Sequence, residues 1–269
     1  MKNEFKEPEL SVADLSESLY QVSRKLQDAN EELRKKDQEK SEFYANISHD
    51  LRAPITAISN SVEYMQSNPN MSQEELEATL EVVALRTDYL KQLINDIFLL
   101  ASLESSTATI HPEPVDVRFL IEDFFYMCEE DTAYKDCHLK LELTDSFVAA
   151  NPVLNLDPRM MNRVFDNLFN NALKYSDDSP VITLKADLVE DNVLQISVTD
   201  EGIGIAPDNL DKIFERSFRV DYSRNPNGSS GGGFGLPIVK TIVERLGGCV
   251  TCESELGAGT QVTISFVIL

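Results

Sequence analysis

Apolar residues in the first part of the chain recur at alternating steps of three and four positions. A repeat of 3.5 residues predicts a coiled-coil seam, which needs a partner helix. We interpret residues 1–40 as a coiled-coil signalling helix; the pattern fits simple dimerisation as well as the transmission of motion toward residue 49. The seam consists of Val12, Leu15, Leu19, Val22, Leu26, Ala29 and Leu33, continues through the polar Lys36 and Lys40, and reaches Phe43 and Ile47.

The same helix is expected to run to about Gln66 and to kink at Pro54, because proline removes one backbone hydrogen bond and clashes with the preceding turn. The polar residues 68–71, Asn-Pro-Asn-Met, predict a turn after it. A second helix is therefore expected to run back along the first.

Ser72 and Glu75 have the spacing of a capping box, which predicts the start of this second helix; we expect it to end near Glu104. Two antiparallel helices cannot bury their apolar stripes alone, whereas two copies form a four-helix bundle. Residues 41–104 therefore predict a homodimer built on a helical hairpin. The stripe of the second helix is Leu76, Leu80, Val83, Leu90, Leu93, Ile97 and Leu100.

The small polar residues 105–109 suggest a domain boundary, and a mixed pattern of helices and strands follows them. Helices on one face of a mixed sheet predict a two-layer α/β sandwich for residues 108–269. The expected helices are Val117–Glu130, Asp157–Ser176 and Ile238–Leu246, and the expected strands are Leu139–Leu143, Val181–Leu188, Val193–Thr199, Cys249–Glu253 and Gln261–Val267.

Composition narrows the possible partners and compartments. No run approaches 18 consecutive apolar residues, and the N-terminus lacks the apolar region of a signal peptide, so we expect no membrane contact within this chain. This fits a soluble cytoplasmic protein or the cytoplasmic part of a longer membrane-bound sensor. The net charge of −22 argues against nucleic acid as a partner.

The four cysteines do not predict a disulfide framework in a chain of this length. Cys249 and Cys252 have the C-x-x-C spacing, but side chains three positions apart on a strand point to opposite faces. A joint metal or redox site is therefore not expected there.

Four sequence motifs occur in a fixed order. His49 stands beside Asp50, one turn before Pro54; the others are Asn167-x-x-x-Asn171-Ala-x-Lys-Tyr-Ser, Asp200-x-Gly202-x-Gly204, and a glycine-rich run that ends at Leu236. In this order and spacing, residues 40–269 resemble the catalytic core of a two-component sensor histidine kinase. The resemblance implies a dimeric helical hairpin and an ATP-binding sandwich of the Bergerat (GHKL) type.

The resemblance also implies a reaction at the first motif. His49 would attack the γ-phosphorus of ATP, and Asp50 would accept a hydrogen bond from the other ring nitrogen. The phosphoryl group would then pass to an aspartate of a response-regulator receiver domain. The family often carries threonine or asparagine where this chain has Ala53, which puts phosphatase activity in doubt. Arg52 fits either a solvated charge or a phosphate contact.

For the nucleotide, the resemblance implies that Asn171 binds Mg²⁺ through its amide oxygen, Lys174 contacts phosphate, and Tyr175 packs against adenine. Asp200 would accept a hydrogen bond from the adenine amino group. The remaining implied nucleotide-binding residues are Asn167, Gly202, Gly204, Arg219, which would reach the γ-phosphate, Gly231, Gly233, Gly235, Leu236 and Thr260.

Two other classes of function compete with the kinase. A scaffold or pseudokinase would dimerise and bind ATP without transferring phosphate. A free-standing ATPase of the gyrase, Hsp90 and MutL group would resemble the same sandwich, but that group places a glutamate at position 167 to activate water. Asn167 cannot act as a general base, which favours phosphoryl transfer to a protein side chain over hydrolysis.

Overall fold

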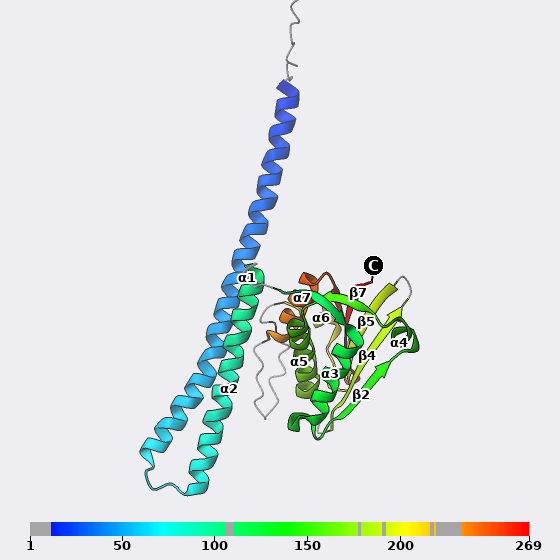
Figure 1. Ribbon diagram of the computed structural model, residues 1–269. Helices are drawn as coiled ribbons and strands as arrows, with labels where there is room; N and C mark the ends of the chain where they lie inside the picture. The colour runs from blue at the N-terminus through cyan, green and yellow to red at the C-terminus, as the bar shows by residue number, and fades with distance from the viewer. Residues whose placement is uncertain are drawn as a thin grey trace, which may run out of the picture. The chain divides into compact units, whose positions relative to one another are not determined.

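The chain comprises two compact units, Met1–His49 and Asp50–Leu269. The computed structural model describes residues 12–105, 110–176, 179–189, 192–215, 218 and 233–268. The first unit contains the N-terminal part of helix α1 (Val12–Ser67), drawn in blue in Figure 1. Four apolar residues of the predicted seam are exposed in the single chain: Leu19 at 64%, Val22 at 55%, Leu26 at 65% and Leu33 at 62%. The coiled coil itself stays a prediction.

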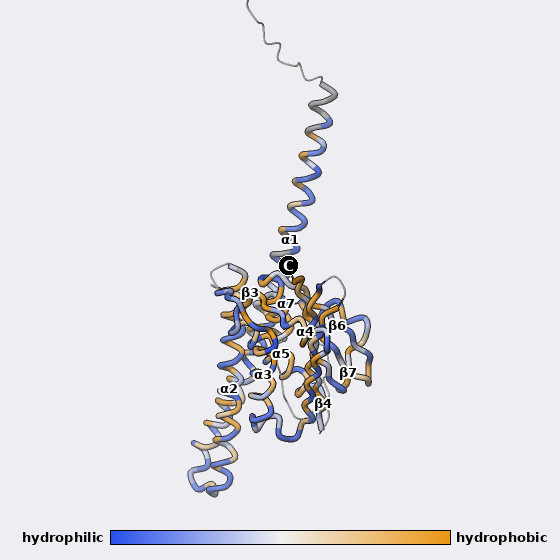
Figure 2. The backbone as a smooth tube through the Cα atoms, turned by 45° about the vertical axis from the view of Figure 1, so that its right-hand side comes forward, coloured by the Kyte–Doolittle hydropathy of each residue, from blue (hydrophilic) through white to orange (hydrophobic). Residues whose placement is uncertain are grey.

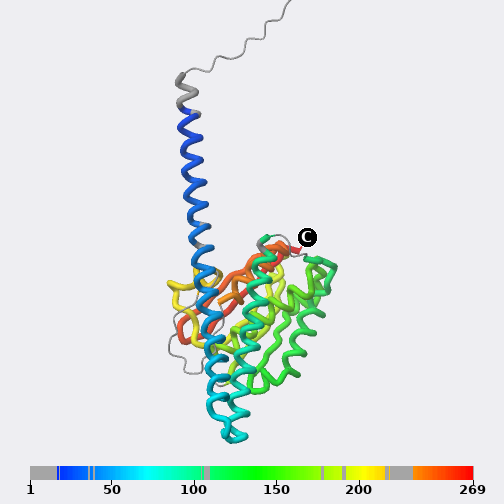
Figure 3. Tube along the Cα trace, turned by 90° about the vertical axis from the view of Figure 1, so that its left-hand side faces the viewer, coloured from blue at the N-terminus to red at the C-terminus, as the bar shows by residue number. Residues whose placement is uncertain are grey.

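The second unit begins with the end of α1, which continues through Pro54 as one helix, and with α2 (Gln73–Glu104). The predicted capping box is confirmed: the Ser72 hydroxyl accepts from the backbone N–H of Glu75 at 3.2 Å, and the Glu75 carboxylate accepts from the backbone N–H of Ser72 at 2.9 Å. Helix α2 runs back alongside the C-terminal part of α1 (Figures 1 and 3). The predicted helical hairpin is therefore present.

A five-stranded mixed sheet follows, as predicted. Its first strand is parallel to the second, and all other neighbours are antiparallel. The order is β2 (His138–Leu143), β4 (Val181–Val189), β5 (Val193–Asp200), β7 (Gly259–Val267) and β6 (Cys249–Glu255).

Helices α3 (Val117–Glu130), α5 (Pro158–Tyr175) and α7 (Gly235–Arg245) lie on one face of this sheet (Figure 1). Hydrophobic and polar residues alternate along the strands (Figure 2), and the phase that faces the helices is buried. The core also contains an aromatic cluster in which the ring of Phe124 lies 5.2 Å from Phe165 and 5.0 Å from Phe169. The predicted two-layer α/β sandwich is confirmed.

Several short elements were not predicted from the sequence. The strand pair β1 and β3 forms a separate two-stranded antiparallel sheet. Asp157, which is 3% exposed, joins this region to α5, because its carboxylate accepts from the backbone N–H groups of Arg159, Met160 and His111. The unpredicted elements are β1 (Glu113–Asp116), η1 (Thr132–Tyr134), α4 (Asp145–Ala150), β3 (Val153–Leu156) and α6 (Pro207–Leu210).

The buried aromatic cluster gives a stability prediction. Phe165→Ala removes a ring that is 0% exposed and should lower the free energy of unfolding by about 3–5 kcal/mol. Phe119→Ala, on the solvent side of α3 at 68% exposure, should change it by less than about 0.5 kcal/mol. Urea denaturation followed by far-UV circular dichroism measures both, since the chain has no tryptophan. Equal effects of the two changes would contradict this packing.

Candidate functional site

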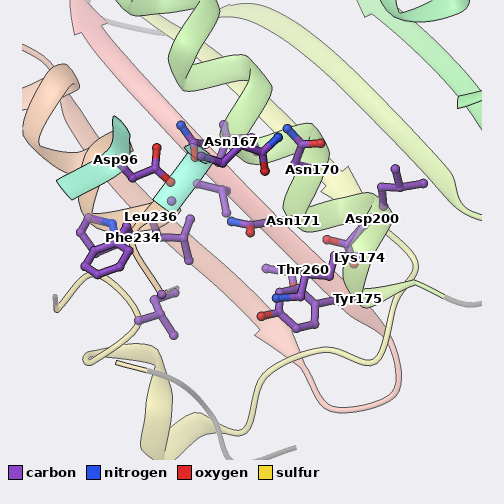
Figure 4. Close-up of a pocket in the computed structure, with 18 of the residues that line it drawn as sticks. Asp96, Asn167, Asn170, Asn171, Lys174, Tyr175, Asp200, Phe234, Leu236 and Thr260 are labelled. Atoms are coloured by element: carbon purple, nitrogen blue, oxygen red, sulfur yellow. The ribbon is translucent and has the colours of Figure 1, made fainter. Parts of the chain in front are cut away.

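The second unit contains a cavity of about 850 Å³ lined by α2, by α5, by the start of α7 and by the ends of β5 and β7. Figure 4 shows side chains from helices and strands directed into it. Ten of the residues singled out from the sequence line this cavity: Asn167, Asn171, Lys174, Tyr175, Asp200, Gly204, Gly233, Gly235, Leu236 and Thr260.

Asn167 and Asn171 lie one turn apart on α5, which begins at the Asp157 cap with Pro158 in its first turn. The Asn167 amide N–H donates to the backbone oxygen of Arg163 at 2.7 Å. This bond leaves the Asn167 amide oxygen for other contacts. A Cβ at Gly235 would lie 3.0 Å from that oxygen, so the glycine allows α7 to approach α5 closely here.

The end of α5 is packed against the turn that follows β5. The backbone oxygen of Tyr175 accepts from the N–H of Ile203 at 3.0 Å. A Cβ at Gly202 would lie only 2.3 Å from the same oxygen, so a side chain at this position would push the two segments apart. The ammonium group of Lys174 lies 4.8 Å from the centroid of the Tyr175 ring. Gly202 is buried in the turn and does not line the cavity.

Asp200 ends β5, and its carboxylate points into the cavity (Figure 4). Burial raises the pKa of this carboxyl, while hydrogen bonds from the backbone N–H groups of Gly202 and Thr260 partly lower it. The Gly202 bond measures 2.9 Å. Gly204 has a positive φ of 66°, and a Cβ there would lie 2.0 Å from the backbone oxygen of Glu255. The turn after Asp200 is therefore held between α5 and the β6–β7 hairpin.

Thr260 lies beside Asp200 in the register of β5 and β7, and Ser254 lies beside Thr260 in the register of β7 and β6. The hydroxyl oxygens of Ser254 and Thr260 are 2.9 Å apart. Ser254 was missed in the sequence. The available signal was a hydroxyl on the inward-facing phase of β6, which it shares with Val250 and Cys252.

Helix α7 begins at Gly235 without a side-chain cap on its first turn. Gly233, with a positive φ of 69°, and Phe234 bring the chain into this helix. The N-terminal end of α7 lies in the cavity wall through Gly235, Leu236 and Pro237. Arg219 and Gly231 lie outside the described residues.

His49 lies exposed on α1 at the end of the first unit. The next residue, Asp50, begins the second unit and is only 9% exposed. Ala53 is exposed on the same helix. Neighbouring side chains on a helix diverge, which explains how one of this pair faces solvent while the other is buried.

One wall of the cavity was not foreseen, because α2 contributes polar residues that lie outside its apolar stripe as well as apolar ones. Arg86, Tyr89 and Asp96 line the cavity there. The Asp96 carboxylate forms an ion pair with Arg163 of α5. Burial raises the pKa of Asp96, and the charge of Arg163 opposes this shift.

The four cysteines are free thiols. Cys249 is exposed and Cys252 faces inward, where burial, together with the nearby Asp200, raises the pKa of its thiol to about 12. Among the described residues there is no cluster of His, Cys, Asp and Glu that could hold a metal ion by itself. In the same part of the chain, no helix combines the length and apolarity needed to cross a membrane.

Two protein-family models match the chain. Residues 39–106 match the His Kinase A (phospho-acceptor) domain, and residues 156–268 match the histidine kinase-, DNA gyrase B- and HSP90-like ATPase. The first match contains His49, and the second contains all ten of the sequence-predicted residues that line the cavity.

Among known proteins, the sensor histidine kinase WalK of Bacillus subtilis is 33% identical over 238 residues, which are 87% of this chain and 38% of WalK. The chain thus spans less than two fifths of that relative. The histidine kinase AdeS of Acinetobacter baumannii has a similar fold, with a TM-score of 0.62 and 21% identity over 82% of this chain and 98% of AdeS. Histidine kinase ThkA, solved with response regulator protein TrrA, gives a TM-score of 0.67 and 20% identity over 85% of this chain and 61% of that one.

Gly204 and Gly257, which both have a positive φ, provide a matched test of the turn. Gly204→Ala should lower the free energy of unfolding by about 3 kcal/mol or more, because a left-handed conformation and a backbone overlap both oppose it. Gly257 has a φ of 83°, but a Cβ added there would meet open space. Gly257→Ala should therefore lower the free energy of unfolding by only about 1 kcal/mol. Urea denaturation of both variants checks this difference. Equal costs would show that the Glu255 contact does not constrain the turn.

The raised pKa of Asp200 predicts that its charge destabilises the fold near neutral pH. Its folded-state pKa lies above the unfolded value, so stability falls as pH rises through that interval. Asp200→Asn should therefore be more stable than wild type near neutral pH, and the difference should shrink in acid.

Asp187→Asn is the control of opposite sign. A hydrogen bond from Thr144 lowers the pKa of Asp187, so its charge stabilises the fold above the unfolded pKa. This variant should be the less stable one near neutral pH. Denaturation curves at neutral and acidic pH measure both effects; a destabilised Asp200→Asn near neutral pH would contradict the first prediction.

Proposed function

We propose that this chain, which belongs to the two-component sensor histidine kinases, phosphorylates itself on His49 with ATP and Mg²⁺. The observation that carries this proposal is the cavity that gathers Asn171, Lys174 and Asp200 in a chain that also exposes His49 on a helix. Matches to a phospho-acceptor domain and to an ATPase domain, in that order, support it.

The base of the nucleotide is assigned to the end of the cavity near Asp200. This carboxylate is fixed by the N–H groups of Gly202 and Thr260, which leaves it in place to accept a hydrogen bond from the amino group of adenine. Tyr175 offers a half-exposed ring for packing against the base. The selection of adenine would follow from a hydrogen-bond acceptor at a partly buried position.

The phosphates are assigned to the end formed by α5 and the start of α7. N–H groups at an uncapped helix N-terminus bind anionic oxygens, and Gly233 and Gly235 permit close approach. Lys174, on α5, also lines the cavity and supplies a positive charge to it. Arg219, outside the described residues, is proposed to reach the γ-phosphate.

The residues present fit Mg²⁺. The metal prefers oxygen ligands, keeps several waters and takes other ligands from phosphates, so it needs few protein donors. Asn171 and Asn167 bring amide groups into the cavity, and we assign the metal contact to Asn171. Bound Mg²⁺ would neutralise phosphate charge during transfer.

His49 performs the chemical step in this proposal. A neutral ring nitrogen attacks the γ-phosphorus; an N–P bond forms, the bond to the bridging oxygen breaks, and its electron pair leaves with ADP. The other ring nitrogen retains its proton and hydrogen-bonds to Asp50, which stabilises the positive ring. Because adjacent side chains diverge on a helix, this contact requires rotamers that turn the two side chains toward each other. The exposed position of His49 on α1 supports access to a nucleotide.

Asn167 argues against hydrolysis as the main activity. Its amide N–H is committed to the backbone of Arg163, and an amide cannot remove a proton from water. The alternative ATPase function therefore lacks a base at this position. The alternative scaffold function would leave the cavity residues and His49 without a joint role.

Two partners follow from the same proposal. The first is a second copy of this chain, since large apolar side chains of the hairpin remain exposed in the single chain. They include Ile55 at 50%, Leu80 at 48% and Phe98 at 70%. We propose the domain limits 1–40 for the coiled coil, 41–104 for the dimerisation domain and 108–269 for the ATP-binding domain.

The second partner is a response regulator whose receiver aspartate takes the phosphoryl group from His49. The solved complex of ThkA with TrrA, whose kinase shares this fold, supports this assignment. A cytoplasmic location, as a separate protein or as part of a membrane-bound sensor, fits such a partner. Ala53 offers no polar group to orient water, so we expect weak phosphatase activity.

Incubation with γ-labelled ATP and Mg²⁺ tests the proposal. Wild type should acquire label that is stable to alkali and labile to acid, and His49→Ala should acquire none. His138→Ala, an exposed histidine at the start of β2, is the matched control and should label like wild type. Circular dichroism and ATP binding establish that His49→Ala is folded.

Each alternative has its own outcome in this experiment. Label that persists in folded His49→Ala would refute His49 as the acceptor. Steady release of phosphate by His49→Ala would favour the ATPase. ATP bound by wild type without any label, in the full dimer, would favour the scaffold.

A further inference from the structure

We infer that Ser254 sets the nucleotide specificity of the cavity by fixing the direction of the Thr260 hydroxyl. The inference rests on the proposed function, because it assigns the adenine base to the end of the cavity at Asp200. Ser254 itself does not line the large cavity, so it acts through Thr260 and is a positioning residue.

Ser254 joins three segments through one oxygen atom. Its hydroxyl donates to the backbone oxygen of Gly259 at 2.7 Å and accepts from the backbone N–H of Ile205 at 2.8 Å. The third partner is the Thr260 hydroxyl at 2.9 Å. Strand β6, the start of β7 and the turn after Asp200 therefore meet at this side chain.

A count of protons decides the direction of the third bond. A serine hydroxyl has one proton to donate and two lone pairs to accept with. The backbone oxygen of Gly259 can only accept, so it takes the single proton of Ser254. Thr260 must then donate its own proton to Ser254. Toward the cavity, the Thr260 hydroxyl can therefore act only as a hydrogen-bond acceptor.

The consequence is a pair of acceptors at one end of the cavity. Asp200 and Thr260 are cross-strand neighbours, and both line the cavity. A purine with an amino group at position 6 presents two N–H donors to such a pair, directly or through water. A purine with an oxygen at position 6 would place its lone pairs against two further acceptors, which is unfavourable. The geometry thus favours ATP over ITP and GTP.

Removing the Ser254 hydroxyl should relax this selection. In Ser254→Ala, Thr260 is free to rotate and donate to a 6-oxo group, and Ile205 loses its acceptor. We expect the ratio of ATP to ITP affinity to fall about tenfold, the value of one hydrogen bond of about 1.4 kcal/mol. KM for ATP should rise, while kcat for autophosphorylation should change little, because the phosphate end is untouched.

The experiment measures ATP and ITP binding by calorimetry on the full chain, together with autophosphorylation kinetics. Ser254→Thr keeps the hydroxyl and should keep the wild-type ratio. Ser265→Ala removes a hydroxyl from the opposite face of the neighbouring strand and should also leave the ratio unchanged. Circular dichroism confirms the fold of each variant.

A double-mutant cycle separates positioning from general loosening. If Ser254 acts through Thr260, then Ser254→Ala should no longer change the ATP to ITP ratio in a Thr260→Val background. An equal loss of ATP and ITP affinity in Ser254→Ala would show a merely structural role and overturn the inference. So would an unchanged ratio in that single variant.

The proposed function and this inference fail in different ways. Wild type that binds neither nucleotide would refute the assignment of the cavity to ATP, and the inference would fall with it. Wild type that binds ATP selectively and becomes labelled, but whose selectivity does not depend on Ser254, would refute the inference alone.

Discussion

The apolar inner face of the five-stranded sheet must be covered, and the way α5 covers it determines where the cavity forms. The buried residues of α5 follow the helical period and turn one full stripe toward the sheet. Asn167 and Asn171 lie at the edge of that stripe, half-buried, where α7 begins. The interaction that buries the core therefore also places two amides beside a helix N-terminus. A shift of α5 along the sheet would move both.

Much of this arrangement could be predicted from the sequence, because it depends on local patterns. Helix Val117–Glu130 begins and ends where its apolar period does, and the Ser72–Glu75 capping box marks the start of α2. Hydrophobic and polar residues alternate along β4, β5 and β7, and this alternation distinguishes the inner face of the sheet from the outer one. In these segments local preference and the final fold agree.

Other parts could not be predicted, because they depend on contacts between distant segments. Strand β1 has four residues, one of them Pro114, and becomes a strand only through its pairing with β3. In the sequence, nothing distinguishes Asp96 from the other charged residues of α2, because its ion pair with Arg163 forms only in the folded chain. Ser254 carried a weak signal, a hydroxyl on an inward phase, whose meaning depends on the register of three strands.

The charge of the chain makes the phosphate end the more demanding part of the site. At a net charge of −22 the protein as a whole repels a polyanion, so attraction has to be local. Of the three cationic side chains described in the cavity wall, Arg163 is already paired with Asp96, Lys174 lies over the ring of Tyr175, and Arg86 belongs to the α2 wall. Backbone N–H groups and a metal ion must then carry much of the phosphate binding.

The base end of the cavity differs from the phosphate end, because it holds a negative charge, the Asp200 carboxylate, in a partly buried position. The pKa of Asp200 is raised because burial outweighs its two backbone hydrogen bonds. The charged carboxylate therefore destabilises the fold. A ligand that donates hydrogen bonds to that carboxylate would offset part of this destabilisation. The direction of the Thr260 hydroxyl then matters, because a donor beside Asp200 would satisfy the carboxylate without any ligand. Because Ser254 accepts the hydroxyl proton of Thr260, Thr260 would not donate to Asp200. The Asp200 carboxylate would then accept its further hydrogen bond from the base of the nucleotide.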